Sequence, residues 1–281
     1  MRLALCNEVV RDLAFERQCE TAAALGYAGL EIAPFTLGAE AFRLPAARRA
    51  ALRRASADAG IGVSGLHWLL VAPPGLSITT REEAVWRKTL EVMHRLIDLC
   101  ADLGGSYLVH GSPAQRRIAS EPDQRLAAER GVAAFAAAAS RAAAANVTYL
   151  IEPLAAPHAD FITSIAEAVG IVRSIASPAV KTMLDTRAAS LGERVSAAQL
   201  LHQWLPSGLI AHVHLNDRSG HAPGQGSDRF APVLEALCEA RYGGWIGIEP
   251  FEYIPDGASC AARAIGYVRG LLEGMGHGRS S

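Results

Sequence analysis

Two segments of the chain end an apolar run in a glutamate that is followed directly by a proline. They are TYLIEP, in which Glu152 precedes Pro153, and WIGIEP, in which Glu249 precedes Pro250. Proline has no N–H to donate to a sheet, so a strand in either segment is expected to end here. A carboxylate at the end of a buried strand costs free energy unless a metal ion or a substrate group pairs with it. The two glutamates are therefore candidates for catalytic chemistry.

Polar residues recur at this position, directly after a short apolar run. In chain order they are His67, His110, Glu152, Asp185, His214 and Glu249. Successive members are separated by 43, 42, 33, 29 and 35 residues, each close to the length of one strand plus one helix. Residues spaced in this way are far apart in the chain, yet they meet around one axis if the strands close into a barrel.

Four of these residues, Glu152, Asp185, His214 and Glu249, form a set typical of a divalent metal site. Three converging carboxylates repel one another strongly at low dielectric, and a divalent cation removes this conflict. Mn²⁺ or Mg²⁺ suits ligands that are mostly carboxylates, whereas Co²⁺ or Zn²⁺ accepts the imidazole well. We predict one divalent ion here, with Mn²⁺ preferred. For Asp185 alone, the competing interpretation is an N-cap of the next helix.

The elements that must position these residues follow from an alternation of short apolar runs with longer amphipathic, alanine-rich runs. Strands are predicted at residues 3–6, 29–33, 62–66, 106–110, 148–151, 180–184, 209–214 and 244–248. Helices are predicted at 15–25, 45–59, 81–103, 122–145, 164–175, 196–204, 232–241 and 258–273. Strands that are apolar throughout indicate a parallel sheet buried on both faces. We therefore predict an α/β fold, a single (βα)8 TIM barrel over residues 1–275, followed by a flexible tail at 276–281.

Two segments that follow predicted strands are longer than the usual strand-to-helix connection. They span residues 68–80 and 219–230, and both are rich in proline and glycine. In a barrel these segments lie on the face that carries the active site. We expect them to cover the site as lids.

Composition narrows the class of partner. The 281 residues include 27 basic and 28 acidic side chains, which gives a formal net charge of −1. Nucleic-acid and membrane-surface partners both require a field of one sign, so a small-molecule substrate is expected instead. The five cysteines have no paired spacing and are expected to be reduced core or helix-face residues. Together with an N-terminus unlike a signal peptide and no apolar run long enough for a membrane helix, this predicts a cytoplasmic protein.

The ordered motifs resemble those of the xylose isomerase-like TIM barrels. They are LIEP at 150–153, MLDT at 183–186, HVHLND at 212–217, PGQG at 223–226 and IEPF at 248–251. This superfamily holds ketose 3-epimerases, hydroxypyruvate isomerase, inosose dehydratase and an AP endonuclease family. The resemblance covers nearly the whole chain. It implies a metal-dependent sugar isomerase or epimerase that is often dimeric.

By this resemblance, Glu152, Asp185, His214 and Glu249 bind the metal, and the two glutamates also move the proton. They would stand on opposite faces of a carbon next to a carbonyl, with the metal stabilising the enediolate. One carboxylate removes the proton and the other returns it from the far side, which inverts the centre. Proton return to the neighbouring carbon would make an aldose–ketose isomerase, and loss of a β-hydroxyl would make a dehydratase of an inosose- or shikimate-like compound.

Three positions depart from the ketose 3-epimerase pattern. Where those enzymes usually hold a glutamate, a histidine and an arginine that bind the sugar, this chain has His158, Ala188 and Gly220. The resemblance therefore points away from a standard ketohexose and towards a different polyol, keto acid or modified sugar.

The endonuclease branch offers a further comparison. His67 and His110 stand where that family binds a second zinc, but Ala188 and Phe230 replace its third-zinc histidines. The near-neutral charge also supplies no DNA-binding face. We therefore prefer substrate contact for His67 and His110, with a second metal as the alternative. A barrel that keeps the metal only as a structural element is the remaining alternative.

Other candidates for substrate contact lie after predicted strands. They are His158, Glu8, Trp68 and Arg117, added to His67 and His110. Each has an ordinary interpretation as well: a plain loop residue for His158, a surface ion pair for Glu8, packing for Trp68, and a solvated loop edge for Arg117 beside Arg116. Glu31 can also reach the pocket, but Glu8 is preferred. His212, one layer below His214, is interpreted as a hydrogen-bonded core histidine.

Overall fold

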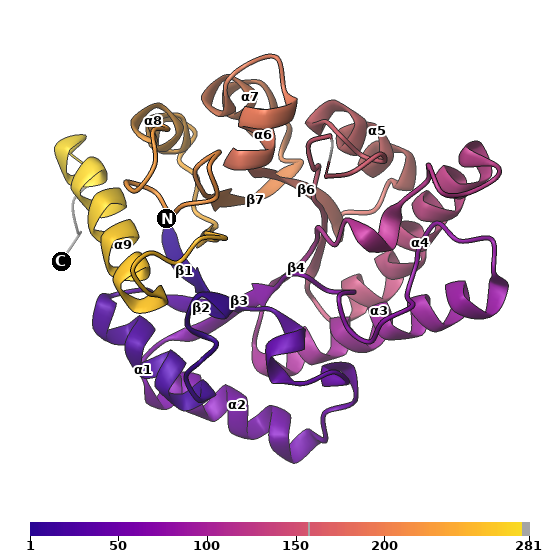
Figure 1. Cartoon of the computed structure of the whole chain (residues 1–281), viewed down its shortest axis with the longest axis horizontal. Coiled ribbons are helices and arrows are strands. Elements are labelled where there is room, and N and C mark those ends of the chain that lie inside the picture. The colour runs from indigo at the N-terminus through magenta and orange to yellow at the C-terminus, as the bar shows by residue number, and fades with distance from the viewer. Residues whose placement is uncertain (157, 277–281) are drawn as a thin grey trace.

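Eight parallel strands form a closed barrel in the computed structural model, which describes residues 1–156 and 158–276 (Figure 1). Each strand pairs with its neighbours in chain order, and β8 pairs with β1. The strands are β1 (Arg2–Cys6), β2 (Gly29–Ile32), β3 (Gly62–Leu66), β4 (Tyr107–His110), β5 (Thr148–Ile151), β6 (Val180–Asp185), β7 (Ile210–Leu215) and β8 (Trp245–Ile248). The predicted (βα)8 barrel is confirmed.

Helices surround the barrel on the outside (Figure 1). They are α1 (Phe15–Leu25), α2 (Ala46–Asp58), α3 (Glu83–Leu103), α4 (Gln124–Ala144), α5 (Ile165–Ile175), α6 (Thr186–Gly192), α7 (Ala197–Trp204), α8 (Ala231–Glu239) and α9 (Gly257–Gly274). Every predicted strand and helix is present, with ends within two residues of the expected positions. Several differences at helix starts arise because the expected first residue is the N-cap, as at Ser164 and Ser196.

The short helix α6 was not predicted. It begins directly after β6, and the Asp185 side chain caps it by accepting a hydrogen bond from the Ala188 backbone N–H at 2.6 Å. Seven residues are too few to show a helical periodicity in the sequence. Both interpretations of Asp185 therefore hold at once, because this carboxylate ends a barrel strand and caps the next helix.

The lower part of the barrel interior is filled by side chains rather than open. A buried cluster contains Ala4, Tyr107, Val109, Leu150, Met183 and Trp245, drawn from five strands. Because side chains alternate across a strand, the next inward positions towards the C-terminal ends lie in a layer above this cluster. That layer carries the polar residues predicted for the site.

One inward position must be a glycine for this layer to fit. Gly247 pairs with His214 in the β7–β8 register. A Cβ atom at position 247 would lie 2.7 Å from both Glu31 Oε2 and His214 Cδ2, closer than packed atoms approach. The absent side chain thus leaves room for the glutamate and histidine that meet inside the barrel.

The two long loops are joined to neighbouring loops at the C-terminal face. In the loop after β3, the Ile78 N–H donates to the Gln115 carbonyl at 2.9 Å. In the loop after β7, the Gly220 carbonyl accepts from the N–H groups of Phe251 and Glu252 at 2.7 and 3.0 Å. Both loops lie on the expected face of the barrel. Their motion as lids stays a prediction.

The expectations drawn from composition can be compared with the described residues. The five cysteines are free thiols. Among residues 1–156 and 158–276, no helix combines the length and apolar character needed to cross a membrane. The expected flexible tail falls mostly on residues 277–281, which lie outside the described residues.

A methyl group at Gly65 should destabilise the barrel, whereas one at Gly62 on the same strand should not. A Cβ at position 65 would lie 2.5 Å from the Tyr107 carbonyl and 2.6 Å from its ring, and one at position 62 meets nothing within 4 Å. We expect Gly65→Ala to lower the free energy of unfolding by about 1–3 kcal/mol and Gly62→Ala to change it by less than about 0.5 kcal/mol. Denaturant unfolding measures both, and equal effects would contradict this packing analysis.

Candidate active site

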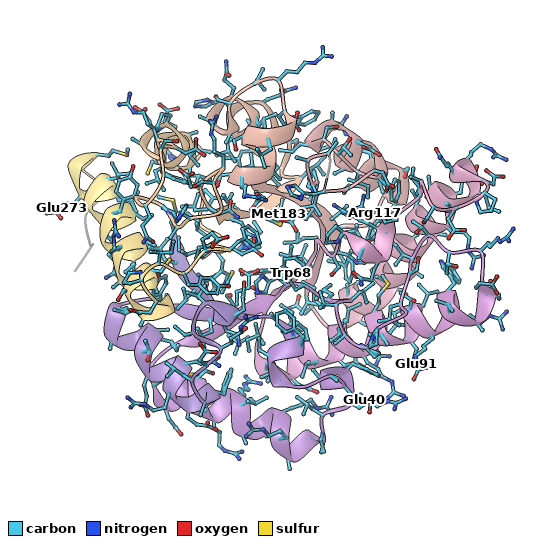
Figure 2. The ribbon with its side chains drawn as sticks, in the orientation of Figure 1. Glu40, Trp68, Glu91, Arg117, Met183 and Glu273 are labelled. Carbon is cyan, nitrogen blue, oxygen red and sulfur yellow. The ribbon has the colours of Figure 1, made fainter. Side chains whose placement is uncertain are left out.

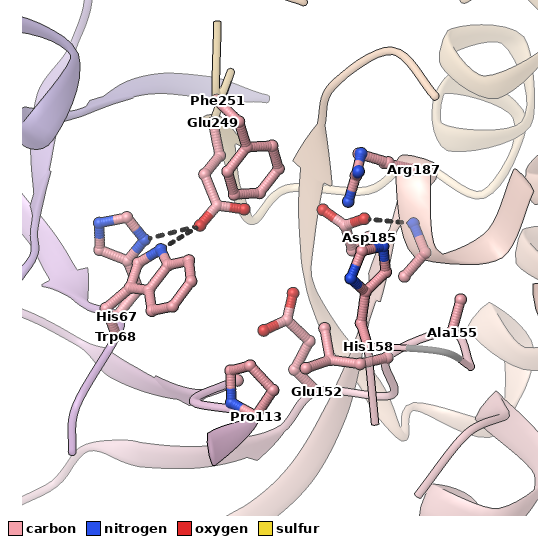
Figure 3. Close-up of a pocket in the computed structure, with 13 residues that line it drawn as sticks. His67, Trp68, Pro113, Glu152, Ala155, His158, Asp185, Arg187, Glu249 and Phe251 are labelled. Atoms are coloured by element: carbon pink, nitrogen blue, oxygen red, sulfur yellow. Dashed lines mark hydrogen bonds and ion pairs between the residues drawn. The ribbon is translucent and has the colours of Figure 1, made fainter. Parts of the chain in front are cut away.

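The four predicted metal ligands come together at the C-terminal end of the barrel. One ligand atom from each of Glu152, Asp185, His214 and Glu249 lies within 4.8 Å of all the others, and all four residues are buried. They come from β5, β6, β7 and β8 or the residue that follows, so four neighbouring strands deliver them to one point. Figure 3 shows the Glu152 and Glu249 carboxylates pointing into one cavity from different strands, with Asp185 beside them.

The chemistry of this set fits a divalent cation. Nδ1 of His214 is buried and has no hydrogen-bond partner among the described residues. It lies 3.0 Å from Glu249 Oε2 and 3.8 Å from Glu152 Oε1, at ion-pair distance but without hydrogen-bond geometry. An unpaired imidazole nitrogen facing carboxylate oxygens is what a cation with oxygen and nitrogen ligands requires. The residues present would therefore hold such an ion.

Glu31 fixes the orientation of His214 from below. Its Oε1 lies 2.9 Å from His214 Nε2, and its Oε2 accepts from the Tyr107 hydroxyl at 2.7 Å and lies 3.1 Å from His212 Nε2. Burial opposes ionisation of Glu31, but His214 and His212 outweigh it and hold the pKa of this carboxyl well below its usual range. The negative charge favours a proton on His214 Nε2, so Nδ1 would be the nitrogen that binds a metal.

Glu249 is held by donors on one oxygen and faces the ligand set with the other. Its Oε1 accepts from Trp68 Nε1 at 3.0 Å and lies 3.1 Å from His67 Nδ1. His67 Nε2 in turn lies 2.9 Å from Glu8 Oε2. Burial raises the pKa of Glu249, but His214 and then His67 lower it to about 2. Glu249 is therefore an ionised carboxylate in a fixed position.

Glu152 is in the opposite electrostatic state. Burial, together with the charge of Glu249, raises the pKa of Glu152 to about 8. A Cβ at Gly111 would overlap the Glu152 carboxylate, so this glycine gives the side chain its space. The backbone carbonyl of Glu152 accepts a hydrogen bond from the buried Arg116 guanidinium at 2.6 Å. For Asp185, burial and then Glu249 raise the pKa to about 6.

A cavity of about 300 Å³ opens in front of these ligands. The carboxylates of Glu152, Asp185 and Glu249 form one part of its wall. Apolar surface forms much of the rest, from Trp68, Gly111, Pro113, Leu154, Ala155, Ala188 and Phe251. A wall of this kind, with a few convergent polar groups in an apolar cleft, is typical of a small-molecule site.

Four of the predicted substrate contacts lie at or next to this cavity. His67, Trp68 and His158 line it, and His158 is exposed. Glu8, in the 3-10 helix Asn7–Val10, is buried beneath the cavity and reaches Glu249 through His67. Glu8 therefore contacts His67 and does not lie on the cavity wall.

The structure does not bring His110 or Arg117 to the cavity wall. His110 is buried, its Nδ1 lies 2.7 Å from the Tyr149 hydroxyl, and its ring packs edge-on against Phe135 of α4 at 5.0 Å. Its strand neighbours Tyr107 and Val109 point inward, so alternation turns His110 out towards the helices. Arg117 is exposed and lies among the loops beside α4 and α5, whereas Trp68 lies near the centre of the ring (Figure 2).

Two residues close to the site were missed or undervalued by the sequence analysis. Glu31 is fully buried in β2. The signal in the sequence is that Glu31 is the single acidic residue of the otherwise apolar strand GLEI, which should have raised its priority as a site residue. Arg187 lines the cavity but belongs to the unpredicted helix α6, so its direction could not be inferred from a periodic pattern.

The family model described as the xylose isomerase-like TIM barrel matches residues 19–270. The chain belongs to this family. A probable ketose 3-epimerase from Synechocystis sp. is 25% identical over 182 residues, 64% of this chain, and the match spans 62% of that protein. A putative hydroxypyruvate isomerase from Streptomyces coelicolor is 29% identical over 242 residues, 75% of this chain and 80% of that protein.

Solved structures of two sugar epimerases share the architecture. A D-psicose 3-epimerase with D-tagatose from Clostridium cellulolyticum H10 superposes with a TM-score of 0.83 at 19% identity, covering 97% of this chain and 99% of that one. A 3-keto-D-glucoside 4-epimerase from E. coli gives a TM-score of 0.83 at 18% identity, covering 96% and 99%. At these identities the likeness establishes the fold.

The three departures from the epimerase pattern fall in different surroundings. His158 and Ala188 line the cavity. Gly220 does not line it, and instead its carbonyl anchors the backbone of Phe251 and Glu252. Two of these three positions thus lie on the cavity wall.

Removing the charge of Glu152 should stabilise the metal-free protein at high pH. The pKa of Glu152 is raised from 4.5 to about 8, so the folded state keeps a proton that the unfolded chain loses. This group therefore destabilises the folded state progressively as pH rises from about 4.5 to about 8. In EDTA at pH 8 we expect Glu152→Gln to stabilise the fold by about 2–4 kcal/mol, or roughly 4–16 °C in Tm.

The same comparison at pH 4.5 is the internal control, because the difference in Tm should nearly vanish there. Glu235→Gln, which removes an exposed carboxylate on α8, should show no such pH-dependent gain. Thermal unfolding followed by circular dichroism measures all three proteins. A Glu152→Gln variant no more stable than wild type at pH 8 would contradict the proposed charge conflict.

Glu31→Gln should weaken metal binding without removing a ligand. Loss of the charge that holds the proton on His214 Nε2 is expected to reduce affinity for Mn²⁺ by about 10–100-fold. Titration followed by electron paramagnetic resonance measures the free ion, with Glu235→Gln as the matched surface control. Unchanged affinity in a variant that keeps its circular dichroism spectrum would show that Glu31 does not position His214.

Proposed function

We propose that this chain is a divalent-metal-dependent isomerase or epimerase of a sugar or a related polyhydroxy carbonyl compound. The main observation in support is that Glu152 and Glu249 line one cavity and form a buried cluster with Asp185 and His214. Mn²⁺ is the proposed ion because three of the four ligands are carboxylates.

In this proposal the two glutamates move a proton at a carbon next to the substrate carbonyl. A divalent cation, when bound, would supply electrophilic stabilisation for the negative charge that develops on the carbonyl oxygen. One carboxylate takes the proton, and the other returns it to the opposite face of the carbon or to its neighbour. Inversion gives an epimer, and return to the neighbouring carbon gives an isomer.

The surroundings of the two glutamates support a role for both in proton transfer. Trp68 and His67 fix the direction of Glu249 through its Oε1, and Gly111 leaves space for the Glu152 carboxylate. The apolar wall formed by Trp68, Pro113 and Phe251 would exclude water from the reacting carbon. Positioning of this kind contributes to the rate by holding the reacting groups in a productive geometry.

The relatives support the same class of reaction. The names ketose 3-epimerase and hydroxypyruvate isomerase both denote rearrangement at a carbon beside a carbonyl group. Since these matches are 25% and 29% identical, they support the reaction class and leave the substrate open.

The test is exchange of a carbon-bound proton in heavy water by protein loaded with Mn²⁺. Proton NMR would follow D-fructose, L-ribulose and hydroxypyruvate. We expect exchange with at least one of them, and we expect Glu152→Gln or Glu249→Gln to slow it by about 10²–10⁴-fold at saturating metal. Glu235→Gln should retain the wild-type rate.

Three results would count against this proposal. The first is metal-loaded protein that exchanges no compound of the panel, and the second is a Glu152→Gln variant as fast as wild type. The third is formation of a new ultraviolet-absorbing product without a stable exchanged substrate, which indicates dehydration instead. Metal analysis of each variant separates loss of the ion from loss of proton transfer.

A further inference from the structure

Arg187 brings a cationic side chain to the wall of the cavity. It is the second residue of α6, and its backbone N–H donates to Asn216 Oδ1 at 2.9 Å, which ties the start of the helix to the loop after β7. Figure 3 shows Arg187 on the Asp185 side of the cavity, across from His67 and Trp68. The side chain therefore stands opposite the residues that hold Glu249.

The Arg187 guanidinium is not committed to a protein carboxylate. Its Nε is buried and has no hydrogen-bond partner among the described residues. Its Cζ lies 5.2 Å from the centre of the Phe251 ring, so an aromatic side chain supports the group. None of the ion pairs found within the described part of the chain involves Arg187, whereas Arg49, Arg130, Arg141 and Arg218 are all paired.

The other cationic groups near the cavity are placed differently. His67 lies between Glu8 and Glu249. Arg116 donates through Nη1 to the Glu152 carbonyl, and although its Nε and Nη2 have no partner among the described residues, it is fully buried and does not line the cavity. The three carboxylates of the wall face His214 and the proposed ion. Among the described residues that line the cavity, Arg187 is the one arginine, and its donors remain available to a ligand.

An unpaired, partly buried guanidinium is costly, and the ligand that best removes this cost is an anion. Arginine presents planar N–H donors that match the two oxygens of a carboxylate or phosphate. A neutral hydroxyl can accept one of these hydrogen bonds but supplies no opposite charge. The adjacent Ala188 adds only a methyl group to the wall, so no neighbouring polar side chain on α6 replaces Arg187 here.

We infer that the substrate carries a carboxylate or phosphate group, which Arg187 binds while the carbonyl end of the molecule faces Glu152 and Glu249. This inference rests on the proposed function and adds the class of substrate: an anionic polyhydroxy carbonyl compound rather than a neutral sugar. Arg187 is thus a specificity-determining residue at the end of the cavity away from His67.

A binding experiment tests the inference without requiring turnover. Calorimetry on protein loaded with Mn²⁺ would compare sorbitol, gluconate and sorbitol 6-phosphate, which share a six-carbon polyol chain and differ in the terminal group. We expect wild type to bind at least one of the two anions about tenfold or more tightly than sorbitol. The gluconate and phosphate arms distinguish the two anionic groups.

Two variants that each remove one positive charge separate the effect of Arg187 from a general effect of net charge. Arg187→Met keeps a long apolar side chain and should remove the preference for the anion by about tenfold or more, with little effect on sorbitol. Arg194→Met removes an exposed arginine outside the cavity wall and should keep the preference. Thermal unfolding confirms that each variant is folded before binding is compared.

The exchange assay supplies an independent readout. For an anionic substrate such as hydroxypyruvate or D-fructose 6-phosphate, Arg187→Met should raise KM by about tenfold or more and change kcat less. Equal binding of sorbitol and both anions by wild type would overturn the inference. So would an anion preference that survives in folded Arg187→Met.

Failure of the inference and failure of the proposed function give different results. Glu152-dependent exchange of D-fructose with no role for Arg187 would overturn the inference and leave the proposed function intact. An anion preference that depends on Arg187, without exchange of any compound, would support the binding site and contradict the proposed reaction.

Discussion

Repulsion among buried carboxylates is the constraint on which the rest of the site depends. Five of them are buried near the C-terminal end of the barrel, with three imidazoles between them: Glu8, Glu31, Glu152, Asp185 and Glu249, and His67, His212 and His214. The charge of His214, with further charge and hydrogen bonds from His212 and His67, lowers the pKa values of Glu31 and Glu249, whereas burial and neighbouring carboxylate charge raise the pKa values of Glu152 and Asp185. A divalent cation at the ligand set would remove the remaining conflict.

The barrel makes this concentration of charge possible because it supplies support from below. Glu31 is fully buried inside the closed sheet, where Tyr107 and His212 hold its carboxylate. Gly247 leaves the gap in which Glu31 meets His214. Packing in the lower barrel is therefore coupled to the orientation of the proposed metal ligand His214 in the layer above. A substitution that changes this packing is expected to change the orientation of His214.

Predictions from the sequence were reliable where one local rule decided the answer. Glu152 and Glu249 end apolar strands before prolines, and the barrel topology then requires them to meet. The same rule placed His110 at a strand end but could not give its direction, which depends on the alternation within β4. The sequence also could not tell which of two adjacent arginines points inward. Arg117 was predicted to contact substrate, but it is exposed, and Arg116 is the one that is buried, against the Glu152 carbonyl.

The sequence by itself determined the fold, the order of the strands and the four residues that gather at their ends. These follow from hydrophobic periodicity and from proline and glycine positions, which act over a few residues. Only the tertiary structure decided that Glu31 supports His214, that Glu8 acts through His67, and that Arg187 faces the cavity. Those relations join residues from different strands and loops, and their geometry exists only once the barrel has closed.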